Sequence, residues 1–587
     1  SVALMLQVDM ANGIEKIDID PDTHGRSAPQ WLVRAAVEEF YNLGYEHLGY
    51  ATHFYSLNYA AKEGAGSDHE SFLRAGIPAI DFTTDVTKPI HTPRDNFENF
   101  DPRGLKRTGD VVIRLVERFD NGTPGRETEQ YWLYLVGKTP LFISFQLLWA
   151  FVGLTIALTI IAFIKVRKRR EPVESPDRVR WSGVKMWLLS SIIVACGWFS
   201  SELIGLVRNV RHPWMTAIPE YYILAAIAAC IGIWLSIRIS KKLRLSRCPY
   251  VFFKRATIIL VIFLVLLGYA NVKLMVEPAV ALFLISLAVL VRNPFLKVLF
   301  AALSPWWMLR LVFSEWSALY FRGGATALPS DIGAWLMFNG IMVLFLGLYI
   351  LPLLYAGAAV IRDSSYLNSI IPKFRSTLVL AAVTIAFIAY AGFLLTEPVY
   401  DHLWYRDLRI EQRYDMNRYK KVISLKSGEY LSDVKITHGG RDTILDTRGT
   451  EATLTPTHAF DTTWLTVERQ EQKHQLDDTT TNYDIELTLR AATRPYTVSV
   501  SYYAGKLKSF DTEWNFQYDK GLRTISWYSF PDSVLKIPVE FQVTGNDSVR
   551  ESIEVTFAKL ADPMTIEREL TYVIPRTKFS AKYVYKK

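Results

Sequence analysis

Cysteine is scarce in this chain of 587 residues, where it occurs only three times. Cys196 and Cys230 fall inside long apolar runs, and Cys248 lies beside a basic loop. The water-soluble parts therefore have no disulfide framework, which favours a bacterial periplasm slightly over a eukaryotic lumen. Low-complexity stretches and clear internal repeats are also absent.

The charge pattern of a nucleic-acid-binding protein is lacking as well, although the formal net charge is +8. Many basic residues lie between apolar runs, as in residues 165–170 and 241–244, where they set membrane topology instead. Half of the residues are hydrophobic, and they cluster into runs long enough to cross a bilayer. We therefore expect a lipid bilayer, and no nucleic acid, as a partner.

Eight apolar runs between residues 140 and 396 indicate a polytopic α-helical membrane domain. The runs cover residues 140–164, 184–206, 218–237, 256–275, 277–291, 294–313, 332–360 and 376–396. Basic residues directly after the first run predict that its end is cytoplasmic, which places residues 1–139 outside the cytoplasm. The loops predicted to face outward hold few basic residues, namely Arg208, Arg211, Lys273 and Arg322. An even number of spans returns the C-terminus to the outer side, whereas loss of the short fifth run would reverse it.

Residues 1–125 alternate between strand-like and helix-like patterns. Residues 2–8 form a nearly continuous apolar run, which predicts a strand buried on both faces. Residues 31–43 predict a helix, 77–82 a second strand and 104–119 an amphipathic helix. This alternation indicates an α/β sheet, in which ligands lie beyond the carboxyl ends of the strands.

The stretch from Gly66 to Asn96 gathers the most distinctive polar residues of the chain. It contains Asp68, His69, His91 and Asp95 around the second strand. Carboxylates and imidazoles at the ends of neighbouring strands are suitable ligands for a catalytic zinc ion. His91 stands ahead of Thr92 and Pro93, and the proline favours an extended backbone before it.

Three motifs carry a resemblance to a known family: Gly66-Ser-Asp-His69, Gly76-Ile-Pro-Ala79 and His91-Thr-Pro-Arg-Asp95. In this order they resemble the C-terminal half of the dinuclear zinc aminopeptidases of peptidase clan MH. The apolar strand that ends at Asp9 resembles the family strand that carries a metal-binding aspartate. The resemblance implies two zinc ions, a peptide substrate, and Asp9 and His91 as zinc ligands. Asp68, His69 and Asp95 would lie around the metals or contact the substrate.

The family site also requires a histidine, a bridging aspartate and a Glu-Glu pair that supplies the general base, all upstream of the strand ending at Asp9. These four residues would precede Ser1. Because the sequence has no initiator methionine or signal segment and opens inside a strand, we expect a fragment, with zinc chemistry completed in a longer parent.

Residues 397–587 predict an all-β extracytoplasmic domain. Short alternating strands separated by turn signals are typical of a β-sandwich. With residues 126–139 as a linker, the order of peptidase half-domain, membrane domain of residues 140–396 and β-domain resembles the endoplasmic-reticulum metallopeptidase (Felix-ina) and vacuolar membrane protease group and its bacterial relatives. A bacterial inner membrane is favoured over an endoplasmic-reticulum or vacuolar membrane, and the oligomeric state stays open.

These patterns support one main hypothesis and two alternatives. The main hypothesis is a membrane-anchored zinc exopeptidase that removes residues from peptide N-termini outside the cytoplasm. One alternative is a degenerate peptidase scaffold whose bundle and β-domain bind partners. The other is a transporter with a peptidase lobe. It is suggested by Glu202 and Arg310, which are ionisable residues inside apolar runs, where such residues are often functional. His24, His47 and His53 belong to no motif, and we expect them in surface or loop positions.

Overall fold

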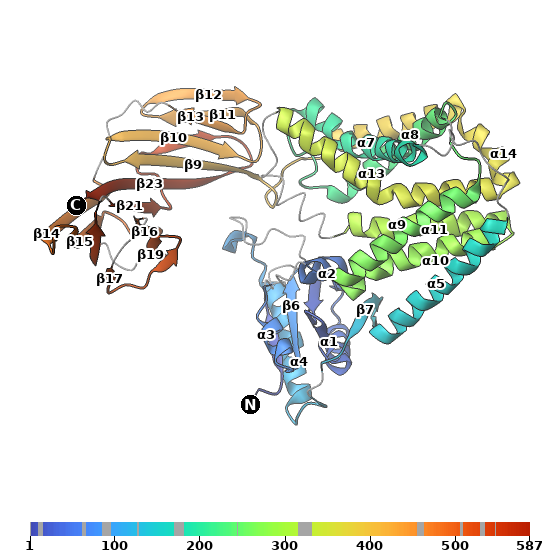
Figure 1. Cartoon of the computed structure of the whole chain (residues 1–587), viewed down its shortest axis with the longest axis horizontal. Helices are drawn as coiled ribbons and strands as arrows, with labels where there is room; N and C mark the ends of the chain where they lie inside the picture. The colour runs from blue at the N-terminus through green and yellow to red at the C-terminus, as the bar shows by residue number, and fades with distance from the viewer. Residues whose placement is uncertain are drawn as a thin grey trace. The chain divides into compact units, whose positions relative to one another are not determined.

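The computed structural model divides the chain into two compact units, Ser1–Trp404 and Tyr405–Lys587. It describes residues 2–9, 16–60, 66–84, 95–125, 128–168, 181–243, 245–314, 332–454, 463–504, 509–528, 534–545 and 547–586. The first unit contains an α/β lobe and a helical bundle, and the second contains strands (Figure 1). The expected sequence of α/β, helical and β-rich regions is therefore confirmed.

The α/β lobe, residues 2–125, contains a four-stranded mixed sheet. Its order is β1-β6-β2-β5, with bounds Met5–Val8, Ala79–Thr84, Ile17–Asp20 and Leu48–Gly49. β1 is parallel to β6, whereas β2 is antiparallel to β6. A short hairpin, β3 (Asp22–Thr23) with β4 (Arg26–Ser27), follows β2. The described part of the lobe also contains the α-helices α1 (Gln30–Asn42), α2 (Thr52–Ala60), α3 (His69–Arg74) and α4 (Pro102–Phe119).

Two predictions for the lobe differ from the structure in detail. The apolar run 2–8 is only partly a strand, and Val2 and Val8 are 47% and 41% exposed. β1 is an edge strand of the described sheet, and its residues are half-buried or exposed, so it is not buried on both faces as we expected. The second predicted strand begins at Ala79 and not at Ile77, because the N–H of Ile77 donates to the carbonyl of Phe72 and closes α3.

Residues 128–144 are not a plain linker. β7 (Tyr131–Val136) and β8 (Thr139–Ser144) form an antiparallel hairpin. Its two-residue turn begins at Gly137, whose φ of 58° is the left-handed conformation that such a turn requires. The first helix that is long and apolar enough to cross a membrane therefore begins at Phe145 and not at residue 140. Hydropathy alone extended the span, because residues 140–144 carry no charge and include Leu141, Phe142 and Ile143.

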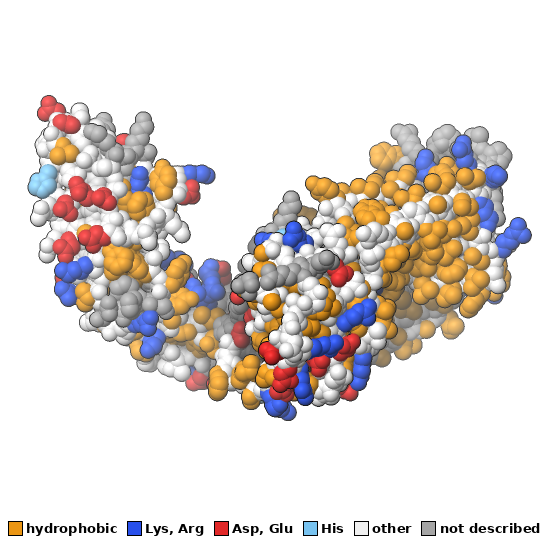
Figure 2. Space-filling model, turned by 90° about the horizontal axis from the view of Figure 1, so that it is seen from below, with side chains coloured by type: hydrophobic (Ala, Val, Ile, Leu, Met, Phe, Trp, Pro, Cys, Tyr) orange, Lys and Arg blue, Asp and Glu red, His pale blue; other side chains and the backbone are white. Residues whose placement is uncertain are grey.

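Eight helices of the first unit are long and apolar enough to cross a membrane, counted over the described residues. This agrees with the eight predicted runs, including the short fifth, which is the most buried of the eight. Hydrophobic side chains dominate the surface of the bundle (Figure 2), as expected of helices that contact lipid. The helices are α5 (Phe145–Lys168), α7 (Ser182–Arg208), α8 (Ile218–Ser240), α9 (Pro249–Ala270), η2 with α10 (Val272–Met275, Val276–Leu290), α11 (Pro294–Val312), α13 (Ile332–Asp363) and α15 (Thr377–Thr396).

Small residues allow the helices of the bundle to approach closely. A Cβ atom added to Gly347 of α13 would lie 2.4 Å from Ser191 Oγ of α7, and one added to Gly232 of α8 would lie 2.7 Å from Ile193 Cα. Ser190 Oγ of α7 also donates to the carbonyl of Gly347 at 2.6 Å. Close backbone contact and hydrogen bonds between helices replace the hydrophobic effect as the source of association in a bilayer.

The second unit is built on one long eight-stranded sheet, in the order β13-β10-β9-β23-β21-β16-β19-β18. A three-stranded sheet, β12-β11-β22, and a four-stranded sheet, β14-β15-β20-β17, accompany it. The strands are β9 (Arg406–Asp415), β10 (Lys420–Ser427), β11 (Leu431–His438), β12 (Arg441–Thr447), β13 (Glu451–Leu454), β14 (Leu465–Gln475), β15 (Thr480–Ala491), β16 (Thr497–Tyr503), β17 (Phe510–Thr512), β18 (Gln517–Asp519), β19 (Leu522–Tyr528), β20 (Val534–Thr544), β21 (Ser548–Phe557), β22 (Met564–Glu567) and β23 (Thr571–Lys586).

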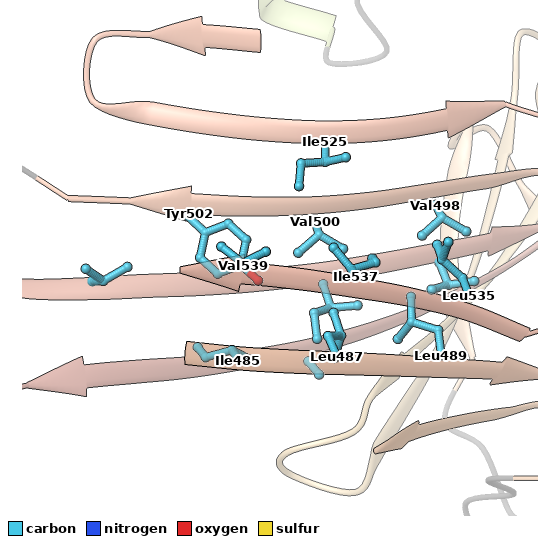
Figure 3. Close-up of a cluster of buried hydrophobic side chains, with 14 of the residues drawn as sticks. Ile485, Leu487, Leu489, Val498, Val500, Tyr502, Ile525, Leu535, Ile537 and Val539 are labelled. Carbon is cyan, nitrogen blue, oxygen red and sulfur yellow. The ribbon is translucent and has the colours of Figure 1, made fainter. Parts of the chain in front are cut away.

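The second unit has two hydrophobic cores, where we predicted a single sandwich. One core joins β15 and β20 to β16, β19 and β21 through alternating residues such as Leu487, Val500 and Ile537 (Figure 3). The other joins β9 and β10 to β11 through residues such as Ile410, Ile423 and Val434. The long sheet contributes to both cores, so the unit is a pair of sandwiches that share one sheet.

Candidate functional site

The structure places four of the five predicted site residues, and the fifth, His91, lies outside the described residues. Asp9 directly follows β1 and is half-buried, and its N–H donates to the carbonyl of Phe82 on β6. Asp68 is exposed at the start of α3, where its side chain makes no capping hydrogen bond. Asp95 is exposed, and the neighbouring Asn96, not Asp95, caps the short helix at residues 97–99.

His69 links the start of α3 to β1. Its backbone N–H donates to Oε1 of Gln7 at 2.6 Å, and its Nε2 donates to the carbonyl of Asp22 at 3.0 Å. Because side chains two apart on a strand point to the same face, Gln7 and Asp9 share one face of β1. The Asp68–His69 turn and Asp9 are therefore brought to the same side of the sheet.

Burial controls the electrostatics of this turn. It lowers the pKa of His69, so the ring is neutral at pH 7. A neutral ring that donates from Nε2 carries a lone pair at Nδ1, and this buried atom has no hydrogen-bond partner in the described structure. Neither of these features is visible in the sequence motif.

Asp81 on β6 is a buried carboxyl with a strongly perturbed pKa. Its Oδ2 accepts from Ser67 Oγ at 2.9 Å, whereas its buried Oδ1 has no partner among the described residues. Burial raises the pKa of Asp81 to about 7, and the charges of Asp20 and Asp9 also raise it, while His69 and Ser67 act in the opposite direction. A carboxyl that titrates near neutral pH can hold or release a proton there.

Asp20 and Asp22, which belong to none of the sequence motifs, complete this buried polar cluster. Asp20 stands directly opposite Asp81 in the antiparallel pairing of β2 with β6. Burial and then the charge of Asp22 raise the pKa of Asp20 well above its usual value. Tyr59 Oη donates to Asp20 Oδ2 and to the carbonyl of Asp22, both at 2.8 Å. A possible signal was the run Ile-Asp-Ile-Asp-Pro-Asp at residues 17–22, whose acids follow a strand period.

Asp22 is also hydrogen-bonded on both carboxylate oxygens. Oδ1 accepts from Ser27 Oγ at 2.5 Å, and Oδ2 accepts from the hydroxyl of Tyr50. Lys273 Nζ of η2 lies 2.7 Å from Oδ2. The lysine therefore brings a positive charge from the helical bundle to an acid-rich interior.

His53 is not a surface residue as we expected. It lies on α2 with 7% of its surface exposed, and its Nε2 is 2.9 Å from Oε1 of Glu277 at the start of α10. Sequence patterns did not reveal this contact, because its two residues are 224 positions apart.

The described residues do not by themselves make a zinc site. Asp9 is a suitable carboxylate donor, but no group of three or more His, Cys, Asp or Glu side chains in the described ranges could hold a metal ion. A zinc centre therefore needs donors from outside these ranges, and His91 is the one that the motif indicates.

A cavity of about 540 Å³ lies among helices α7, α8, α11 and α13 of the bundle. Its walls are mainly apolar, and its polar lining includes Glu202, Asn339 and Tyr221. Trp198 Nε1 donates to Asn339 Oδ1 at 2.7 Å, whereas the buried hydroxyl of Tyr221 has no partner among the described residues. Arg310 does not line the cavity and instead lies over the ring of Trp307.

Comparison with known families identifies a match at the start of the chain. The model of Peptidase family M28 matches residues 3–116. The match contains Asp9, Asp68, His69, His91 and Asp95, and it supports an M28-type peptidase domain in the α/β lobe. No curated protein matches the chain.

Proposed function

We propose that this chain is part of a membrane-anchored, zinc-dependent exopeptidase of the aminopeptidase type. The observation that carries the proposal is the M28 match over residues 3–116, directly ahead of eight helices able to cross a membrane. M28-type domains hydrolyse peptides, so the substrate is a peptide and the reaction is the addition of water across its amide bond. The helices would keep this reaction at a membrane surface.

Asp9 and His91 are the proposed zinc ligands in this chain. The placement of Asp9 at the end of β1, on the same face as Gln7 and the Asp68–His69 turn, supports a site at this edge of the sheet. Asp68 is exposed and available to contact a substrate amine, and His69 fixes the start of α3. Further donors and the general base are expected from outside the described residues, so we derive no catalytic step through the metal.

Zinc content and peptidase activity of the full-length protein test the proposal. We expect D9A and H91A each to lower both the zinc content and kcat/KM by at least tenfold. H474A is the matched control, since His474 is exposed on β14 of the second unit, and it should leave both unchanged. Normal zinc content and turnover in D9A and H91A would refute the ligand assignment. A full-length protein without zinc or turnover would instead favour the degenerate scaffold that binds partners.

Orientation is proposed from the charge of the loops, with the lobe and the second unit on the outer side. Glu98 is exposed in the lobe and Lys373 is exposed at the end of the short helix α14 (Ser365–Phe374). A membrane-impermeant maleimide should therefore label E98C in intact cells or right-side-out vesicles and label K373C only after permeabilisation. The reverse pattern would overturn the orientation, whether the membrane is a bacterial inner membrane or a eukaryotic one.

The cavity in the bundle favours transport as a second candidate function. Its apolar walls and few polar groups are typical of small-molecule sites, and Glu202 supplies an ionisable group within it. A229W would fill the cavity, whereas A302W makes the same Ala-to-Trp change at an exposed position of α11 that does not line it. Ala302 is therefore the matched control position. Uptake of labelled peptide into vesicles that is lost only in A229W would support transport; no uptake by the parent protein would exclude it.

A further inference from the structure

Lys273 is a buried cation that joins the membrane bundle to the α/β lobe. It lies on η2, the short helix between α9 and α10, and is 8% exposed. Its Nζ is 2.7 Å from Asp22 Oδ2 and 3.3 Å from Tyr50 Oη. Burying two charges is costly unless they are paired and hydrogen-bonded, and this pair meets that condition through Tyr50 and Ser27.

Two neighbouring contacts hold the same corner of the bundle against helix α2. Asn271 Nδ2 donates to the carbonyl of Ser56 at 3.1 Å. Glu277 Oε1 is 2.9 Å from His53 Nε2, and the two side chains are 3% and 9% exposed. Asn271, Lys273 and Glu277, all within residues 271–277, therefore each make a polar contact with the lobe. Lys273 is thus part of a surface of the bundle that is docked on the lobe.

Asp22 connects this surface to the candidate site. Its carboxylate receives Lys273, while its backbone carbonyl accepts from His69 Nε2 at 3.0 Å and from Tyr59 Oη at 2.8 Å. Its N–H donates to Asp20 Oδ1 at 3.0 Å. The residue that binds the bundle lysine is thus the residue that holds the ring of His69, and His69 in turn fixes the start of α3 on β1.

We propose that Lys273 is a positioning residue for the candidate site: the loop between two membrane helices holds Asp22 in place and thereby fixes His69 and the first turn of α3. The consequence for catalysis rests on the proposed peptidase function, whereas the mechanical coupling does not. The lobe is therefore built to adopt its working geometry only when docked on the bundle.

A second buried lysine provides the matched control. Lys297 Nζ lies 2.5 Å from Asp363 Oδ2, with side-chain exposures of 5% and 2%. It also donates to the carbonyl of Ala288 at 3.1 Å. This pair joins only helices of the bundle, so it has the same chemistry and burial as the Lys273 pair without contact to the lobe.

Hydrogen–deuterium exchange of the full chain in lipid nanodiscs tests the coupling without requiring activity. We expect K273M to speed amide exchange in peptides covering residues 66–76 at least tenfold, and K273R to restore most of the protection. K297M should change exchange in the same peptides less than twofold. Equal exchange in K273M and the parent, or equal effects of K273M and K297M, would overturn the proposal.

A double variant covers the case in which K273M fails to fold. K273M/D22N removes both charges, so no charge is left buried without a partner, and we expect it to fold with exchange still fast in residues 66–76. Parental protection in this variant would also overturn the proposal. If the full-length parent hydrolyses peptides, K273M should lower kcat more than it raises KM. Absence of any hydrolysis would count against the proposed function and leave the exchange result to decide the coupling.

Discussion

The α/β lobe and the second unit both bury carboxylates, but the buried carboxylates differ in their hydrogen-bond partners. Glu551 on β21 is 1% exposed and accepts from Tyr502 Oη at 2.7 Å and from Tyr585 Oη at 2.5 Å. In the lobe, Asp81 Oδ1 and His69 Nδ1 are buried without a hydrogen-bond partner among the described residues. Burial raises the pKa of both Glu551 and Asp81, so the pKa alone does not distinguish the two places.

The two places differ in whether each buried polar atom has a hydrogen-bond partner. Most buried polar groups in native proteins have a partner, and exceptions call for a functional or structural explanation. Both carboxylate oxygens of Glu551 are used, and the guanidinium of Arg469 lies over the ring of Tyr585, so this network serves the sandwich. The lobe retains unused donor and acceptor capacity beside Asp9 and Asp68, which is what a site for a ligand or a proton requires.

The largest expected effect is a loss of stability on replacing Glu551, because its hydrogen bonds hold together the core of the second unit. E551V leaves two buried tyrosine hydroxyls without an acceptor, at about 1–3 kcal/mol each, so we expect a loss of about 2–6 kcal/mol of stability. Thermal unfolding of the full chain and exchange in residues 548–557 measure it. The control is E554V on the same strand, where Glu554 pairs with Lys578 at the surface and should cost less than about 1 kcal/mol. A tolerated E551V would show that the comparison is wrong.

Asp81 should show the opposite behaviour, with a gain of stability that depends on pH. Its pKa is raised to about 7 in the folded state, so the native state binds more protons than the unfolded state between about pH 4 and pH 7. The contribution of Asp81 to the stability of the parent is thus fully present below about pH 4 and is lost as the pH rises to about 7. D81N removes this penalty, and we expect it to stabilise the lobe above pH 7 by no more than about 4 kcal/mol, that is, about three pKa units.

Unfolding of metal-free protein at pH 5 and pH 8 checks the Asp81 prediction. The benefit of D81N over the parent should be larger at pH 8. D484N is the control, because Asp484 is exposed on β15 of the second unit. Its stability should differ from that of the parent by the same small amount at pH 5 and at pH 8. If the gain in stability of D81N over the parent is the same at both pH values, Asp81 does not titrate between pH 5 and pH 8 and the prediction is wrong.

Sequence periodicity predicted the parts of the fold that depend on local burial. All eight apolar runs correspond to helices able to span a membrane, and the helix expected at 31–43 is α1 (Gln30–Asn42). The prediction failed where tertiary pairing decides: residues 139–144 are apolar enough to extend a helix but pair with β7. Strands β9 and β23, which pair in parallel more than 150 positions apart, left no comparable local signal.

The candidate site was predictable only in its motif residues. Asp9, Asp68, His69, His91 and Asp95 follow from the family resemblance, and their roles remain predictions. The buried cluster was not predicted, because Asp20 and Asp81 become neighbours only when β2 pairs with β6. The charge pattern predicts Lys273 on an outer loop and does not indicate its partner. Asp22 is about 250 positions away, beyond any pattern that one sequence displays.

The smallest expected effect comes from two tyrosines on α2, and it tests the comparison within the lobe itself. Tyr59 Oη donates to Asp20 Oδ2 and to the Asp22 carbonyl, so Y59F leaves buried acceptors underused and should cost about 1–3 kcal/mol. Tyr55 lies one helical turn earlier and is equally buried, but its hydroxyl has no partner among the described residues. Y55F removes only an unsatisfied group, so we expect it to be neutral or slightly stabilising. Equal losses in the two variants would mean that hydrogen-bond completeness does not decide which polar groups stabilise this lobe, and the contrast between Asp81 and Glu551 would lose its basis.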